Sequence, residues 1–258
     1  MSRIDSFFLP PEAWREPFSL QDGEARHALK VLRLGSGARL RCFDGLGREG
    51  LFVLERAGGE ARLSLESERF TPRPEPQTWL ALGFNKSARR GWLLEKAVEL
   101  GAAGILFWEA ARGQGGMPTA PKETWKAQLV AGAKQCGNPW LPEIEVVAGG
   151  AAGLAARCRD FERKSLLWES AGEDRILAPT FLTGSGRRVF VLGPEGGLTQ
   201  PEAQYLQEQG FAPVSLGPRP LRWETAALAC LTLAWWGATL TKSAQNPASP
   251  GGPADDRS

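Results

Sequence analysis

Two glycine- and proline-rich segments in the C-terminal third carry residue types suited to holding a small ligand. The first, "VFVLGPEGGLTQPE" (residues 189–202), turns an apolar run into a Gly-Pro-Glu-Gly-Gly loop, and the second is "SLGPRPLRWETAALACL" (residues 215–231). Glycine lets the backbone approach a flat ligand, and proline stiffens a loop. Backbone amides can form hydrogen bonds with polar atoms along the edge of a flat ligand, and one carboxylate can pair with a positive charge on it.

Several familiar ligand sites are excluded by spacing and composition. The Gly193–Gly197 loop lacks the Lys-Ser/Thr of a Walker A loop, and it lacks the Gly-x-Gly-x-x-Gly of a dinucleotide site. His27 is the single histidine, so a multi-histidine metal site is excluded. The cysteines form no Cys-x-x-Cys pair, and we expect all four to be reduced core or near-core residues: Cys42, Cys136, Cys158 and Cys230. No metal site is therefore expected.

Basic residues are unevenly distributed, although the formal net charge is only +2. They crowd one early segment and recur about a third of the way along the chain: Arg26, Arg33, Arg39, Arg41, Arg48, then Lys86, Arg89 and Arg90. Two interpretations stay open, a solvated charged face and a surface that binds the phosphates of a nucleic acid.

The surrounding pattern predicts two structural units. Residues 71–78, "TPRPEPQT", favour an extended linker, and short alternating runs before it predict a small barrel or sandwich of about 70 residues. After the linker, strands alternate with helices, which indicates a parallel sheet covered on both faces. The expected strands cover 79–84, 104–108, 143–147, 165–169, 188–192 and 212–216, and the expected helices cover 87–100, 121–136, 150–160, 200–209 and 222–240.

The predicted sheet places the two glycine- and proline-rich loops, and a third loop, at one edge. Ligands of open α/β sheets bind beyond the carboxyl ends of the strands, and loops follow Leu167, Leu192 and Leu216 there. Thr199 and Glu202 have the spacing of a capping box, so a helix should begin directly after the first loop. No apolar run is long enough for a membrane span and no signal-peptide pattern opens the chain, so a cytoplasmic location is expected.

Taken together, "LGPEGGLTQPE" and "LGPRPLRWETAAL" resemble the paired signature of the SPOUT methyltransferases. They are similar in particular to the family that methylates N3 of uridine 1498 in 16S ribosomal RNA. "HALKVLR…FDG" resembles that family's PUA-like N-terminal domain, "LEKAVELGAAGI" its Lys-x-x-Glu-Leu-Gly segment, and "KQCGNPWLPEI" its Glu-Gln-(Ser/Cys)-x-Arg…Pro-x-Ile segment. The similarity covers nearly everything between Phe7 and about Leu240.

The resemblance implies a fold, partners and a cofactor. The implied domains are a PUA-like RNA-binding β-barrel at 1–72 and an α/β SPOUT methyltransferase domain with a deep trefoil knot at 73–242. The chain after Lys242 lacks apolar content, so residues 243–258 are expected to form a disordered tail. S-adenosylmethionine would lie in the knot. The implied partners are 16S rRNA in the 30S subunit and a second copy of the chain, so that the RNA site is composed across a homodimer. The final helix, apolar around most of its circumference, would belong to the dimer interface.

The resemblance also implies the site residues. The positions matching the cofactor site are Leu167, Trp168, Glu169, Leu192, Gly193, Pro194, Gly196, Gly197, Leu216, Gly217, Pro220, Leu221 and Arg222. The expected RNA-binding residues are Arg26, His27, Arg33, Arg39, Arg41, Lys86, Arg89 and Arg90. Most of the cofactor contacts would come from the backbone.

Methylation of a uracil nitrogen requires that the nitrogen lose its proton and that the resulting imide anion be stabilised. A guanidinium presents rigid donors to the adjacent carbonyl oxygen. Arg222 is therefore the first catalytic candidate and Arg112 the second. Glu195 could face the cationic end of the cofactor or orient Arg222, and the proton acceptor stays open.

This chain departs from the family pattern in the third supporting segment. Lys134 stands where glutamate is usual, Asn138 stands where arginine is usual, and Trp140 replaces a position that is often basic. Because these positions face the RNA side in the family, the departures bear on the substrate more than on the cofactor. The alternatives are another SPOUT reaction, such as ribose 2′-O methylation, and a non-catalytic RNA-binding protein of the same fold.

Overall fold

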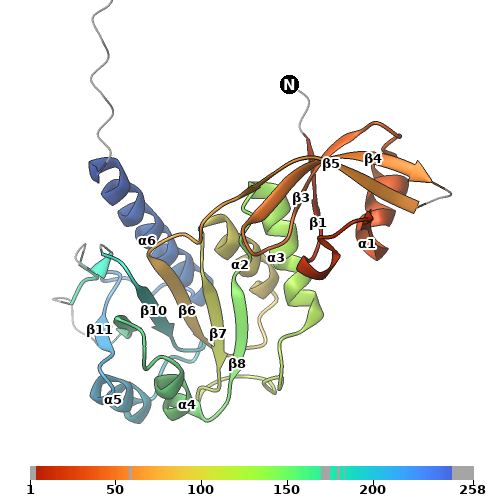
Figure 1. Cartoon of the computed structure of the whole chain (residues 1–258). Coiled ribbons are helices and arrows are strands. Elements are labelled where there is room, and N and C mark those ends of the chain that lie inside the picture. The colour runs from red at the N-terminus through yellow and green to blue at the C-terminus, as the bar shows by residue number, and fades with distance from the viewer. Residues whose placement is uncertain (1–3, 58–59, 170–174, 179–180, 183, 246–258) are drawn as a thin grey trace, which may run out of the picture.

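The computed structural model describes residues 4–57, 60–169, 175–178, 181–182 and 184–245, which form two sheets with their helices (Figure 1). The first sheet has the order β1-β3-β4-β5-β2, with β1 parallel to β3 and the other pairs antiparallel. Its strands are β1 (Asp5–Phe8), β2 (Phe18–Leu20), β3 (Arg39–Phe43), β4 (Arg48–Ala57) and β5 (Glu60–Phe70). A 3-10 turn (Pro11–Ala13), α1 (Asp22–Arg26) and a π-helical turn (His27–Val31) complete this N-terminal domain.

Alternating apolar residues of the N-terminal strands build a core of their own. Phe7, Leu40, Phe52 and Leu54 are fully buried in it, because each points to the inner face of a strand with period two. In the described residues the edge strands β1 and β2 do not pair with each other, so a five-stranded sheet stands where a small barrel or sandwich is predicted.

The second sheet is entirely parallel and has the order β11-β9-β10-β6-β7-β8. Its strands are β6 (Gln77–Gly83), β7 (Gly104–Trp108), β8 (Glu143–Val147), β9 (Arg163–Leu167), β10 (Arg187–Leu192) and β11 (Ala212–Val214). All six lie where the apolar runs predict strands. The α/β class and the parallel sheet are thereby confirmed.

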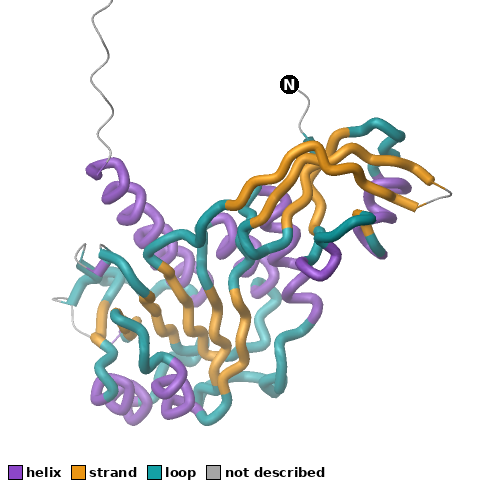
Figure 2. The backbone as a smooth tube through the Cα atoms, in the orientation of Figure 1, coloured by secondary structure: helices purple, strands orange, loops and turns teal. Residues whose placement is uncertain are grey.

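Helices cover both faces of this sheet, as Figures 1 and 2 show. They are α2 (Arg90–Glu99), α3 (Glu123–Cys136), α4 (Gly150–Arg157), α5 (Gln200–Glu208) and α6 (Trp223–Gln245). The buried side chains of α2, α3 and α6 join one apolar cluster, and those of α4 and α5 join another on the opposite face. Strands buried on both faces explain why β6 and β7 read as continuous apolar runs.

The final helix differs from its prediction in length. It continues to Gln245, three residues into the predicted tail, and the rest of that tail lies outside the described residues. Ala227 and Ala234 are buried in the protein's own core, so one face of the helix packs inward. Trp235 and Trp236 of the same helix are exposed.

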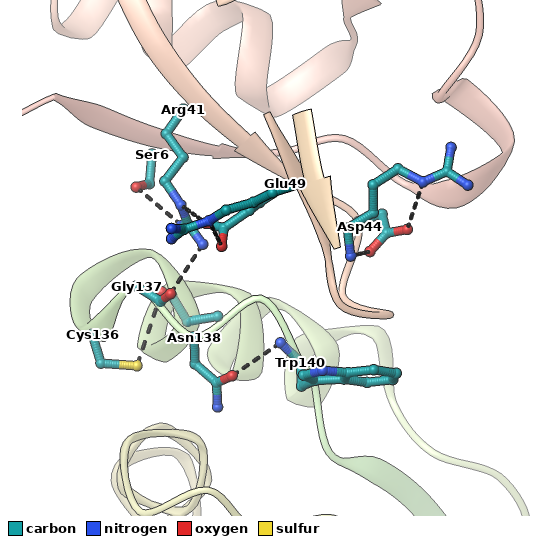
Figure 3. A network of polar contacts seen from close by, with 11 residues as sticks. Ser6, Arg41, Asp44, Glu49, Cys136, Gly137, Asn138 and Trp140 are labelled. Atoms are coloured by element: carbon teal, nitrogen blue, oxygen red, sulfur yellow. Dashed lines mark hydrogen bonds and ion pairs between the residues drawn. The ribbon is translucent and has the colours of Figure 1, made fainter. Parts of the chain in front are cut away.

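The two sheets are connected by a dense set of contacts, here called the domain joint (Figure 3). Arg41 of β3 forms an ion pair with Glu49 at 2.6 Å and donates to the carbonyl oxygen of Gly137 at 2.9 Å. The Trp140 indole donates to the carbonyl oxygen of Thr71 at 2.9 Å. Two backbone hydrogen bonds also link the 45–47 turn to residues 139–141. The joint lies where the linker enters β6 and where β8 begins, at the amino ends of those strands.

Three of the four cysteines confirm the expectation of buried thiols, and one does not. Cys42, Cys158 and Cys230 are buried, and burial raises the pKa of Cys158 and of Cys230 to about 12. Cys136 is exposed, because it lies in the last turn of α3, beyond the last buried residue of that helix, Ala133. Among the described residues, no helix is long and apolar enough to cross a membrane.

Candidate active site

A cavity of about 980 Å³ lies at the carboxyl edge of the parallel sheet. Its walls come from the segments that follow β6, β7, β9, β10 and β11, and from the start of α6. This is the edge at which open α/β sheets bind ligands, and the volume lies at the upper end of the range of ligand pockets. The prediction that the three loops meet at one edge is confirmed.

The structure gathers the predicted cofactor positions around this one cavity. All of them line it: Leu167, Trp168, Glu169, Leu192, Gly193, Pro194, Gly196, Gly197, Leu216, Gly217, Pro220, Leu221 and Arg222. The two other catalytic candidates, Arg112 and Glu195, line it as well. These residues come from four different loops, so only folding brings them together.

The first glycine loop owes its shape to tight backbone packing. A Cβ on Gly83, at the end of β6, would lie 2.6 Å from the backbone nitrogen of Pro194, and one on Gly193 would lie 3.0 Å from the backbone of Leu198. Gly197 has φ +71°, in the left-handed region that favours glycine. A Cβ on Gly197 would meet no described atom within 4 Å, so this backbone is open to a ligand.

The capping box predicted for α5 is present and has a second use. The Thr199 hydroxyl accepts from the Glu202 N–H, and the Glu202 carboxylate accepts from the Thr199 N–H at 2.9 Å. The other carboxylate oxygen of Glu202 accepts from the Ala111 N–H at 2.6 Å. One glutamate thus fixes both the start of α5 and the loop that carries Arg112.

Arg112 holds the first glycine loop through two hydrogen bonds. Its guanidinium donates to the carbonyl oxygens of Gly196 at 3.1 Å and Leu198 at 3.4 Å. These bonds assign it a part in loop positioning, although the side chain also lines the cavity. Glu195, in the same loop, is exposed at the cavity wall.

The second loop delivers Arg222 to the cavity. Gly217 has φ +119°, and its N–H donates to the Ser215 hydroxyl at 3.1 Å. The carbonyl of Arg222 accepts from Ala226 in the first turn of α6, which fixes the backbone at this position. The Arg222 side chain is exposed and lines the cavity, and it makes no ion pair with any described residue.

One buried carboxylate at the cavity was missed by sequence reasoning. Glu224, in the first turn of α6, has a side chain that is only 6% exposed, and it forms an ion pair with Arg89 at 2.6 Å. Both residues line the cavity. The sequence signal was a glutamate two residues after the candidate arginine, but its partner lies 135 residues away in the chain.

The predicted RNA-binding residues fall into three places. Lys86 and Arg89 line the cavity. Arg90 instead points inward, where its guanidinium lies over the rings of Phe84, Phe107 and Trp125 and donates to the Asn85 carbonyl, and burial lowers its pKa. The remaining five lie in the N-terminal domain: Arg26, His27, Arg33, Arg39 and Arg41.

Those five N-terminal residues differ in how far they are already paired. Arg26 and Arg33 are exposed, and Arg33 has a positive φ of 55°. Arg39 pairs with Glu66 at 2.6 Å, and Arg41 belongs to the domain joint. The half-buried His27 ring lies beside Phe7, with their centroids 6.1 Å apart.

The three departures in the third supporting segment all lie at or beside the domain joint. The Lys134 ammonium pairs with Glu24 at 2.9 Å and lies 5.1 Å from the ring centroid of Phe7. The Asn138 amide donates to the Val98 carbonyl at 3.1 Å and accepts from the N–H of Trp140 at 3.0 Å. In this chain these side chains connect the N-terminal domain, α2 and α3.

The residues around the cavity fit an adenosylmethionine-sized ligand better than a metal. Open backbone at Gly197 and Gly217 can approach a flat nucleoside, while Glu169 and Glu195 offer carboxylates to a cationic end. The described part of the chain holds no group of three or more histidine, cysteine, aspartate or glutamate side chains that could bind a metal ion.

Comparisons with known proteins agree with this arrangement. The profile of the RNA methyltransferase domain matches residues 72–235, and that of the RNA methyltransferase PUA domain matches residues 20–64. Ribosomal RNA small subunit methyltransferase E of Mycobacterium bovis is 31% identical over an alignment of 227 residues that covers 81% of this chain and 82% of that protein.

Two solved structures of methyltransferases are similar over most of their length. One from Legionella pneumophila, with bound S-adenosylmethionine, has a TM-score of 0.77 and 26% identity over 90% of this chain and 97% of that one. Ribosomal RNA small subunit methyltransferase E of Neisseria gonorrhoeae, bound to S-adenosylmethionine, has a TM-score of 0.73 and 27% identity over 89% and 95%. The chain belongs to the ribosomal RNA small subunit methyltransferase E family, with a PUA domain followed by an RNA methyltransferase domain.

Proposed function

We propose that this protein transfers a methyl group from S-adenosylmethionine to N3 of uridine 1498 in 16S ribosomal RNA. The observation that carries the proposal is the cavity at the carboxyl edge, where two glycine loops meet Arg222 and the Arg89–Glu224 pair. Its volume of about 980 Å³ leaves room for a nucleoside-sized cofactor together with a base taken out of the RNA stack.

S-adenosylmethionine supplies the methyl group as a sulfonium. The residues that would hold it are those of the glycine loops, chiefly through backbone at Gly193, Gly197 and Gly217. Leu167, Leu192 and Leu216 end or follow the strands beneath these loops and offer apolar surface to a flat ring. Loops fixed by the capping box and by Arg112 are preorganised, so little ordering is needed on binding.

On the RNA side the protein must stabilise the negative charge that develops when uracil N3 loses its proton. The Arg222 guanidinium is the proposed group, because it is exposed at the cavity and its donors can reach a uracil carbonyl oxygen. Arg112 is placed second, since its donors already bond to Gly196 and Leu198.

The exposed arginines of the N-terminal domain are proposed to bind RNA phosphates. Arg26 and Arg33 are the strongest candidates, because neither makes an ion pair within the described residues. Phosphate contacts release counterions, so RNA affinity should fall as salt rises. Because the substrate is ribosomal RNA, we infer that the protein acts in the cytoplasm, on the 30S subunit or its RNA.

A trefoil knot in residues about 189–222 is part of the proposal. The backbone of Ser215, just after β11, bonds to Arg175 and Leu177 of the segment that joins β9 to β10. A Cβ on Gly237 of α6 would lie 2.9 Å from Leu182 of the same segment. The residues before and after the second loop thus both contact the segment that joins β9 to β10. These contacts support a knot in which the C-terminal part of the chain is threaded through the loop formed by that segment.

A homodimer is proposed as the working form, with the RNA site composed across the interface. The outer face of α6 exposes Leu233, Trp235, Trp236 and Leu240. Several large apolar side chains exposed on one helix are typical of a protein–protein interface. The domain joint lies at the amino ends of the strands, whereas the cavity lies at their carboxyl ends. The seven residues of β6 span about 23 Å between the two. A partner could therefore bring further RNA-binding groups to the site.

Mass spectrometry of 16S rRNA from a strain lacking this chain tests the proposal. Loss of N3-methyluridine, restored by the wild-type gene, is the expected result. Loss of a ribose methyl group would instead identify a 2′-O methyltransferase. An unchanged modification pattern would favour a non-catalytic RNA-binding protein.

A further inference from the structure

We propose that Glu224 is a positioning residue for RNA binding at the cavity. Its buried carboxylate holds the Arg89 guanidinium at the cavity wall, where Arg89 meets the RNA beside the target base. The Nη1 atom of Arg89 lies 2.6 Å from Oε1 of Glu224, and both residues line the cavity. This inference rests on the proposed function and names a part of the same site.

The two members of the pair are exposed to very different degrees. The Glu224 side chain is 6% exposed and that of Arg89 is 57% exposed. Burying a carboxylate costs desolvation free energy unless a cation and hydrogen bonds compensate it. The buried Glu224 therefore needs Arg89 as its partner. A guanidinium has five N–H donors, of which this bond uses one, so Arg89 keeps donors for an anionic or carbonyl oxygen outside.

The backbone on both sides of the pair is fixed as well. The N–H of Arg89 donates to the Ser87 hydroxyl at 3.1 Å, directly before α2 begins. Glu224 is the second residue of α6 and stands two positions after Arg222. The ion pair therefore connects the starts of two helices that flank the cavity, and it restrains the turn that presents Arg222.

A role as proton acceptor for uracil N3 is the competing interpretation of a buried carboxylate at this place. One oxygen of Glu224 already accepts from a guanidinium. A general base shows its own titration in the pH dependence of kcat, whereas a residue that positions a permanent cation does not. The shape of the pH profile therefore separates the two roles.

The test compares Glu224→Gln, Arg89→Ala and the double variant in the full-length protein. Glu224→Gln keeps the size of the side chain and removes its charge. We expect S-adenosylmethionine affinity, measured by calorimetry without RNA, to stay within about twofold, and KM for 16S rRNA to rise on the order of tenfold in each single variant. The double variant should be no worse than Arg89→Ala, and the pH profile of kcat should keep its shape.

Glu145→Gln serves as the matched control. It breaks a carboxylate–arginine pair of similar length, 2.5 Å to Arg157, at residues that do not line the cavity. It should leave KM for RNA unchanged. Circular dichroism reports whether each variant is folded.

Three outcomes would overturn the positioning role: an unchanged KM in Arg89→Ala, fully additive effects in the double variant, or a pH profile altered only by Glu224→Gln. Arg89 is largely exposed, so Arg89→Ala tests the inference even if Glu224→Gln fails to fold. Absence of methylation by the wild-type protein would count against the proposed function. In that case calorimetry would still show whether the cavity binds S-adenosylmethionine.

Discussion

Arginine side chains differ in function around the cavity according to what surrounds each guanidinium. Arg112 donates to two carbonyl oxygens of the glycine loop, and Arg90 lies among three aromatic rings. Arg89 is shared between a buried carboxylate and solvent. Arg222 alone among these four has no side-chain hydrogen bond, ion pair or ring contact with the described residues, which leaves its planar fork available for substrate.

Arg222→Ala should lower kcat on the order of a hundred- to a thousandfold, because it removes one preorganised donor from a developing anion. Binding of S-adenosylmethionine and of RNA should change little, since the interaction acts in the transition state. Raising the pH should rescue the variant in part, and Arg222→Lys should retain part of the rate. Steady-state kinetics on 16S rRNA measures both. A variant with full kcat and weakened RNA binding would make Arg222 a phosphate contact and Arg112 the leading candidate.

Gly197→Val should abolish binding of S-adenosylmethionine while the protein stays folded. A left-handed φ costs a residue with a Cβ about 1–2 kcal/mol, and more when it is β-branched, so the loop would shift away from the ligand. Calorimetry measures the affinity and circular dichroism the fold. Gly116→Val is the control, because Gly116 has an ordinary φ and open space around it. Unchanged affinity in Gly197→Val would place the cofactor elsewhere.

Glu49 should make the stability of the N-terminal domain depend on pH. Burial acts to raise its pKa, but hydrogen bonds from Arg69 and Arg41 outweigh burial and lower it. A lowered carboxyl pKa contributes stability above the ordinary value of about 4.3, and that stability is lost as pH falls through the folded-state pKa.

Glu49→Gln should therefore destabilise the protein by about 1–3 kcal/mol at pH 7, and the difference from wild type should shrink below about pH 4. Urea unfolding at several pH values measures it. Glu60→Gln is the control, because its pair with Arg62 is exposed on both sides and should contribute little. Equal behaviour of the two variants would contradict the prediction.

Among the elements, α6 connects the site to the proposed partner. Its first turn carries Glu224, its inner face packs into the core through Ala227 and Ala234, and its outer face exposes Trp235 and Trp236. A helix that is apolar on both faces is stable only when both faces are buried away from water. The inner face is covered by the sheet, so the outer face remains for a second copy.

Trp236→Glu should convert the proposed dimer into a monomer at micromolar concentration, because a charge in a desolvated apolar interface is unfavourable. Light scattering coupled to size exclusion measures the mass. Tyr205→Glu is the control: Tyr205 is exposed on α5, on the opposite face of the sheet. A wild-type protein that is monomeric under these conditions would contradict the dimer itself.

Across the molecule as a whole, the domain joint makes the N-terminal domain part of one packed body. Phe43 of β3 is fully buried in the same apolar cluster as Leu93 of α2 and Trp125 of α3. Removing residues before Gln77 would therefore expose core surface. Charge-reversal variants of the intact chain are the better test of RNA binding by this domain.

The double variant Arg26→Glu/Arg33→Glu should weaken RNA binding and flatten the dependence of log affinity on log salt, by about one unit of slope for each phosphate that is no longer neutralised. Calorimetry should give unchanged S-adenosylmethionine affinity, because the cavity is lined by neither residue. Arg62→Glu, on β5 of the same domain and paired with Glu60, is the control. Equal salt slopes in the wild type and the double variant would contradict phosphate binding by these arginines.

Features that depend on near neighbours in the chain could be predicted from the amino-acid sequence. The six strands of the parallel sheet follow from short apolar runs, and the start of α5 follows from a Thr-x-x-Glu spacing of three residues. The positive φ of Gly197 and Gly217 follows from loops that only glycine can turn. Because all three loops follow parallel strands, their meeting at one edge was also predictable.

Contacts between distant side chains, in contrast, are set by the packing of the folded chain. No local pattern indicates that Arg89 pairs with Glu224 across 135 residues, that Arg41 reaches Gly137 across 96, or that Arg90 lies among aromatic rings. The partner of a side chain depends on which helix and sheet faces pack against each other. How far the side chain is buried depends on several elements at once. Neighbouring arginines with the same local propensity therefore end in different environments, because each one's function depends on the dielectric and the partners that the fold supplies.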